Sequence, residues 1–93
     1  MERRTAAILH ERMVKTTPVN VATAALKAVN AIQTDSTENQ LLGLAAVMIV
    51  MLKQYDLSAT EVLGIADNYV YSGSQMKPQF KALKQFMRDE WQI

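Results

Sequence analysis

Residues 41–52 read LLGLAAVMIVML, twelve consecutive positions without a charge or a hydrogen-bonding side chain. A helix on a protein surface keeps one polar face, whereas a helix that is apolar all round is buried on every side or embedded in lipid. Twelve helical residues rise only about 18 Å, and the hydrocarbon core of a bilayer requires about 30 Å. The sequence therefore predicts a buried helix and no membrane span.

Polar signals bound this helix on both sides. Thr37 followed by Gln40 fits a capping box, and Asp56-Leu57-Ser58 ends the apolar run, so the helix is expected over about residues 38–55. Ala45 and Ala46, beside Gly43, leave room for another helix to come close.

Four further helices are expected from the same kinds of signal. Thr17-Pro18 is a typical helix start, Ser58 with Glu61 forms a second capping box, and Gly73 is a natural left-handed cap. The alanine-rich helix after Pro18 is expected to pack against residues 41–52. No strand is predicted. The expected ranges are residues 2–15, 18–33, 59–71 and 77 to the terminus.

Together these elements predict an all-α fold, a small helical bundle of four to five helices around the central apolar helix at about 38–55. Ninety-three residues suffice for one domain, so residues 1–93 are expected to form a single helical domain. Within it, residues 1–16 form a terminal helix expected to fray or to dock on a partner.

Composition argues against several classes of function. The chain has no cysteine, which excludes disulfides and thiolate metal sites and suits a reducing cytoplasm, where we expect the protein to act. His10 is the only histidine and has no serine or carboxylate pattern around it. Because a catalytic base needs a positioned partner, we expect no enzyme, no metal site and no cofactor.

The net charge of +1 is unevenly distributed, with net +2 in residues 1–15, −3 in residues 16–75 and +2 in residues 76–93. Four cations of the last helix repeat at i, i+4, i+7 and i+11, so they share one sector of it. They are candidates for contact with an acidic partner or with nucleic acid; the alternative is a solvated face whose aliphatic stems lie on apolar neighbours. These residues are Lys77, Lys81, Lys84 and Arg88.

Self-association is the interaction that the sequence favours. A chain this short has too few helices to surround a uniformly apolar one, and a two-sided apolar helix is commonly covered across a two-fold axis. We therefore expect a homodimer that also binds a protein partner, and we rank a small DNA-binding regulator second. The candidate self-association or core residues are Leu44, Val47, Met48, Met51, Phe86 and Trp91.

Two segments carry a resemblance to a known group of proteins. Residues 40–45 (QLLGLA) and 53–68 (KQYDLSATEVLGIADN), with the pattern Tyr-x-Leu-x-x-x-Glu-Val-Leu, are similar to small uncharacterised accessory or early proteins of tailed bacteriophages. The stretch that carries the resemblance runs from residue 40 through residue 68, about a third of the chain. It implies a protein that acts by binding a host or viral macromolecule, and it implies no catalytic residues.

Overall fold

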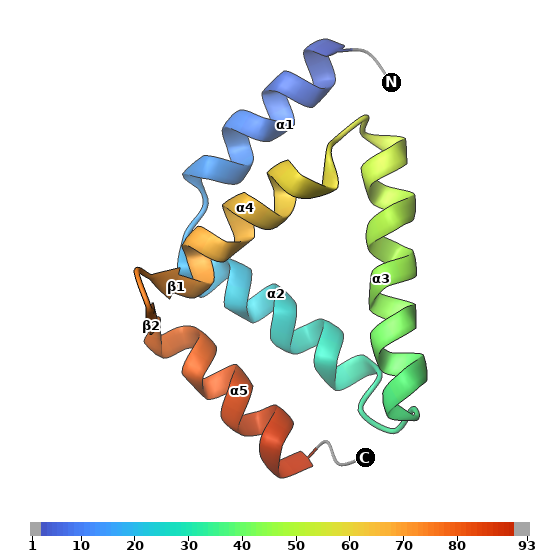
Figure 1. Ribbon diagram of the computed structural model, residues 1–93, viewed down its shortest axis with the longest axis vertical. Helices are drawn as coiled ribbons and strands as arrows, with labels where there is room; N and C mark the ends of the chain where they lie inside the picture. The colour runs from blue at the N-terminus through green and yellow to red at the C-terminus, as the bar shows by residue number, and fades with distance from the viewer. Residues whose placement is uncertain (1–2, 91–93) are drawn as a thin grey trace.

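The computed structural model describes residues 3–90, which form five helices and one two-stranded hairpin (Figure 1). This confirms the mostly helical fold and the order of the helices. The elements are α1 (Arg3–Lys15), α2 (Pro18–Ala31), α3 (Thr37–Gln54), α4 (Ala59–Val70), β1 (Tyr71–Ser72), β2 (Gln75–Met76) and α5 (Pro78–Glu90).

Local capping explains where two of these helices begin. The Thr17 hydroxyl accepts a hydrogen bond from the Asn20 amide (3.1 Å) before α2, and the Ser58 hydroxyl accepts one from the Glu61 amide (3.3 Å) before α4. Both N-caps were predicted, since a side-chain oxygen at this position satisfies an amide that has no partner within the helix.

The predicted capping box before α3 is wrong. The N-cap residue is Ser36. The Gln40 side chain instead reaches back to α2, where its amide nitrogen donates to the carbonyl oxygens of Ile32 (3.0 Å) and Gln33 (3.3 Å). Gln40 is buried, and its amide joins α3 to the carbonyl groups just after α2, where that of Ile32 also accepts from the Asp35 amide (3.0 Å).

The prediction of no strand also fails, at one short hairpin between α4 and α5. Tyr71 pairs with Met76 and Ser72 with Gln75 in antiparallel register. Gly73 has a φ of 63° and lies in the two-residue turn of this hairpin, rather than at the end of a helix as predicted. Glycine adopts this left-handed backbone without steric strain, which is why tight hairpin turns favour it.

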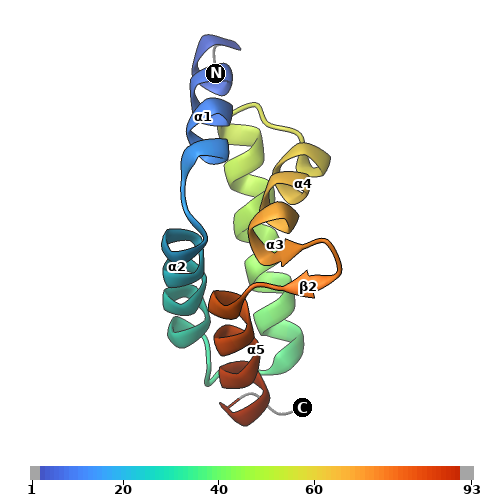
Figure 2. The same cartoon turned by 90° about the vertical axis from the view of Figure 1, so that its left-hand side faces the viewer.

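The best-packed part of the fold lies between α2 and α5, which run side by side (Figures 1 and 2). Val29 of α2 and Phe80 of α5 are the buried apolar side chains of the described residues. The prediction that the alanine-rich α2 packs along residues 41–52 is therefore wrong. Helix α5 packs on this face of α2 instead, where Leu83 and Phe86 lie beside Leu26.

Helix α3 does not form the centre of a bundle. Figure 1 shows α2, α3 and α4 as the sides of a triangle, with α3 meeting the others near its two ends. Gln40 is its buried residue, and its large apolar side chains are mostly exposed to solvent. The expected burial of this helix is thus not achieved by one chain, because α2 is occupied by α5. The exposed apolar residues of α3 are Leu41, Leu42, Leu44, Val47, Ile49, Val50 and Met51.

The turn from α3 to α4 is tight and specific. Asp56 has a φ of 55°, the Leu57 amide donates to the carbonyl of Leu52 (2.8 Å), and the Asp56 amide donates to that of Lys53 (3.4 Å). This pair of bonds is the Schellman arrangement, which closes a helix with a left-handed residue.

Among the described residues, no single helix is long and apolar enough to span a membrane. Helices α3 and α4 reach that length and composition only as a pair, and they are bent by 118° at their junction.

Candidate interaction site

An apolar groove opens between α1, α3 and the start of α4. It is a hollow of about 650 Å³, and its wall consists mainly of aliphatic and methionine side chains. The volume lies in the range of typical ligand pockets, about 300–1,000 Å³. The lining residues are Thr5, Ile8, Leu9, Arg12, Met13, Leu44, Val47, Met48, Met51, Leu52, Tyr55, Leu57 and Val62.

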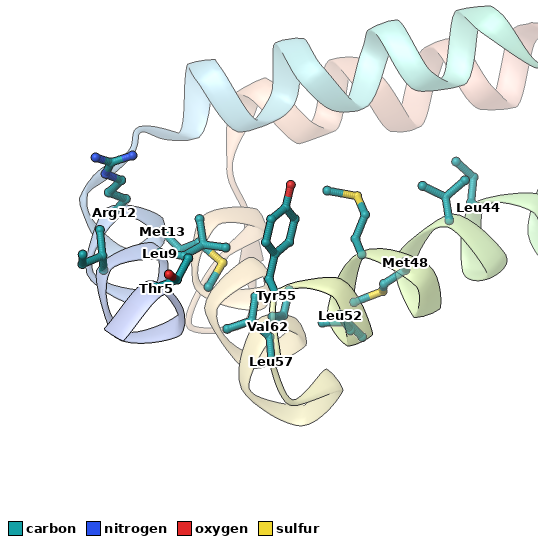
Figure 3. Close-up of a pocket in the computed structure, with 13 residues that line it drawn as sticks. Thr5, Leu9, Arg12, Met13, Leu44, Met48, Leu52, Tyr55, Leu57 and Val62 are labelled. Carbon is teal, nitrogen blue, oxygen red and sulfur yellow. The ribbon is translucent and has the colours of Figure 1, made fainter. Parts of the chain in front are cut away.

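Figure 3 shows how these side chains lie. The ring of Tyr55 stands between the groove residues of α1 and those of α3, and Arg12 lies at the rim on the α1 side. Polar atoms are few, so the groove offers shape and apolar contact rather than a set of directed hydrogen bonds. Such a surface suits an apolar or amphipathic segment. Methionine side chains are flexible and adapt to partners of different shape.

Two polar contacts hold α1 against α4 and so form one wall of the groove. The Tyr69 hydroxyl donates to the carbonyl oxygen of Met13 (2.6 Å) and lies 3.2 Å from that of Thr16. Nδ1 of His10 lies 2.6 Å from Oε1 of Glu61. The two side chains form an ion pair across this distance when the imidazole is protonated.

The contact between His10 and Glu61 was missed by the sequence analysis, which found no carboxylate near the histidine. The residues are 51 positions apart, and no local pattern connects them. Both side chains are partly exposed, at 43% and 46%. We interpret the pair as a link between α1 and α4.

Four of the predicted self-association residues come together on one side of α3. Leu44, Val47, Met48 and Met51 all line the groove. Phe86 does not join them: it is half-buried in a second hollow between α2 and α5, beside Val19 and Leu26. Trp91 lies outside the described residues.

The predicted basic stripe is divided by the fold. The Lys77 ammonium donates to the carbonyl oxygen of Asn68 (2.8 Å) and lies 5.9 Å from the centre of the Tyr69 ring. This lysine therefore caps the end of α4. Lys81, Lys84 and Arg88 remain exposed along α5.

Within residues 3–90, no group of three or more histidine, aspartate and glutamate side chains is placed to hold a metal ion. Comparison with protein-family models, curated proteins and solved structures gave no match. The resemblance to bacteriophage proteins therefore stays a prediction.

Proposed function

We propose that this chain is a non-enzymatic interaction protein that self-associates and binds a macromolecular partner through apolar surface. The observation that carries the proposal is the exposure of large apolar side chains on two sides of α3. Monomeric proteins rarely leave extended apolar patches in water, and such patches mark interaction sites.

The groove is the surface that we assign to the macromolecular partner. Its concave wall is formed by α1 on one side and α3 on the other, and an amphipathic helix binds such grooves through side chains spaced at i, i+3, i+4 and i+7. The absence of cysteine from the sequence fits action in a reducing cytoplasm.

Self-association is tested by sedimentation equilibrium between about 1 and 100 µM, the range in which interfaces of modest affinity show. We expect the weight-average mass to rise above that of one 10.4 kDa chain. A clean monomer throughout this range would contradict the proposal.

The groove is tested separately with an apolar fluorescent dye of the anilinonaphthalene type. We expect saturable binding that Met51→Glu weakens, because this substitution places a charge in the wall of the groove. The matched control is Leu42→Glu on the other side of α3, which should leave dye binding unchanged. Binding that depends on Leu42 and not on Met51 would contradict the assignment.

A second candidate function is DNA binding, and the exposed cations of α5 favour it. Three side chains are available for phosphate contact: Lys81, Lys84 and Arg88. Each contact would add about 0.9 to the downward slope of log affinity plotted against log salt concentration. A mobility-shift titration at several salt concentrations tests this function. The charge reversal Lys84→Glu should weaken a true complex. The charge reversal Lys27→Glu at an exposed position on α2 is the control and should leave it unchanged. The absence of a shift at low salt would contradict it.

A further inference from the structure

We propose that two copies of this chain associate through the side of α3 that faces away from the groove, with the two helices antiparallel. This inference rests on the proposed self-association and names its surface. The surface, here called the α3 seam, is Glu38, Leu42, Ala45, Ala46, Ile49 and Lys53.

The single chain has more surface than a compact protein of its size. Its accessible area is 6980 Å², whereas a folded monomer of this mass exposes about 5,400 Å². The radius of gyration is 14.3 Å, against about 12 Å for a compact chain of this length. The excess area exceeds the approximately 800 Å² that each partner contributes to a standard interface. The excess exposed area is therefore large enough to form an interface with a second copy of the chain.

The α3 seam is separate from the groove. At 3.6 residues per turn, Leu42 and Ile49 lie on the same side of the helix, roughly 100–160° from Leu44 and Met48. Leu42 is 67% exposed and Ile49 is 55% exposed, and neither lines the groove. This side could not be told apart from the groove side in the sequence, because residues 41–52 are apolar all round.

The α3 seam of one copy is complementary in charge and in apolar residues to the α3 seam of a second copy that runs antiparallel to it. An antiparallel partner centred between Ala45 and Ala46 places Leu42 opposite the second copy's Ile49 and Glu38 opposite the second copy's Lys53. A two-fold axis repeats each pair, so both ends carry opposite charges and both apolar residues are covered. The alanines at the crossing point allow close approach of the helix axes, at the lower end of the usual 8–10 Å.

The charges at the ends of the α3 seam are available for this pairing. Glu38 and Lys53 are both exposed, and the ion pairs found among the described residues involve neither of them. A parallel arrangement would place Glu38 against Glu38 and Lys53 against Lys53, which is repulsive at both ends. Charge complementarity thus selects the antiparallel orientation.

Charge exchange provides the first test, by sedimentation equilibrium. Glu38→Lys and Lys53→Glu should each weaken homodimerisation roughly tenfold, since two attractive pairs per dimer become repulsive. The variant that carries both substitutions should recover wild-type association, because the antiparallel pairs are restored. If the double variant remains as weak as the single ones, the pairing is wrong.

Apolar substitutions test the face. Leu42→Glu should abolish the dimer, whereas the control Val47→Glu, in the groove and 58% exposed, should leave it intact. Both residues are exposed in one chain, so we expect both variants to fold, and circular dichroism verifies this. A wild-type dimer that is broken by Val47→Glu and not by Leu42→Glu would overturn this inference while self-association stands. A monomeric wild type would overturn both, and would mean that something other than a second copy covers the face.

Cysteine cross-linking tests the register, since the chain has no native cysteine. Ala46→Cys lies at the proposed crossing point and should form a disulfide-linked dimer under mild oxidation. Leu42→Cys alone should not, because equivalent residues lie about 10 Å apart along antiparallel helices, but its mixture with Ile49→Cys should cross-link. Cross-linking of Leu42→Cys with itself, without the mixed product, would overturn the antiparallel register.

Discussion

The Tyr69 hydroxyl donates a hydrogen bond to the carbonyl oxygen of Met13, at 2.6 Å, across 56 positions of sequence. It joins the end of α1 to the last turns of α4 and lies near the carbonyl of Thr16 as well. Carbonyl groups at the end of a helix have no partner within it, so this phenol supplies a donor where one is needed. The contact fixes the position of α1 and hence the width of the groove.

Tyr69→Phe should therefore loosen α1 more than it disturbs the rest of the fold. The loss of one part-buried hydrogen bond costs about 0.5–1.5 kcal/mol of unfolding free energy. We expect faster amide hydrogen exchange in α1, with exchange in α2 and α5 little changed. Tyr71→Phe is the matched control, because the Tyr71 side chain is exposed in the hairpin. Equal exchange in α1 for the two variants would contradict the role of Tyr69.

The buried Gln40 provides a second prediction, on global stability. Gln40→Met keeps the length of the side chain but removes the donor to the carbonyls of Ile32 and Gln33. The substitution removes two hydrogen bonds worth about 0.5–1.5 kcal/mol each, so we expect a loss of about 1–3 kcal/mol in urea unfolding. Gln54→Met, an exposed position on the same helix, should change stability by less than about 0.5 kcal/mol. Similar midpoints for the two variants would show that Gln40 does not hold α2 and α3 together.

Local chemistry explains which parts of this fold were predictable. Thr17-Pro18 and Ser58 with Glu61 act within three residues, so the sequence alone located the starts of α2 and α4. The two-residue strands at Tyr71 and Gln75 were missed because they are too short to show an alternating pattern. The packing partner of α2 was also not predictable, since both α3 and α5 carry apolar residues at helical spacing and no local signal chooses between them.

The candidate site shows the same division between local and long-range information. The apolar character of Leu44, Val47 and Met51 was evident from the sequence, and so was the shortage of helices to cover them. The opposite wall of the groove was not evident from the sequence. Met13 is held there by a hydrogen bond from Tyr69, which lies 56 positions further along the chain. A signal for the α3 seam is nevertheless present in the sequence. Leu42 and Ile49, and likewise Glu38 and Lys53, lie at equal distances on either side of the midpoint of the seam.

The pH dependence of one carboxyl group provides a third prediction. Hydrogen bonds from the Ser36 hydroxyl and from its own backbone amide hold the pKa of Glu38 below the ordinary 4.5. A carboxyl with a lowered folded pKa contributes stability above its unfolded pKa, and the contribution is lost as pH falls through the folded pKa. Ser36→Ala should raise the pKa of Glu38, as measured by a carboxyl-carbon NMR titration between pH 2 and 7. A titration curve that does not move would contradict the contact.

A fourth prediction contrasts two glycines that differ in backbone conformation. Gly43 lies in the exposed interior of α3 with open space around its missing side chain, so Gly43→Ala should stabilise the helix by up to about 1 kcal/mol. Gly73 has equally open space but a φ of 63°, and Gly73→Ala should destabilise the hairpin by about 1 kcal/mol because a side chain strains this backbone. Thermal unfolding measures both shifts under the same conditions. The opposite signs are the informative result, since available space alone would predict the same effect at both positions. Shifts of the same sign would show that backbone conformation does not distinguish the two glycines.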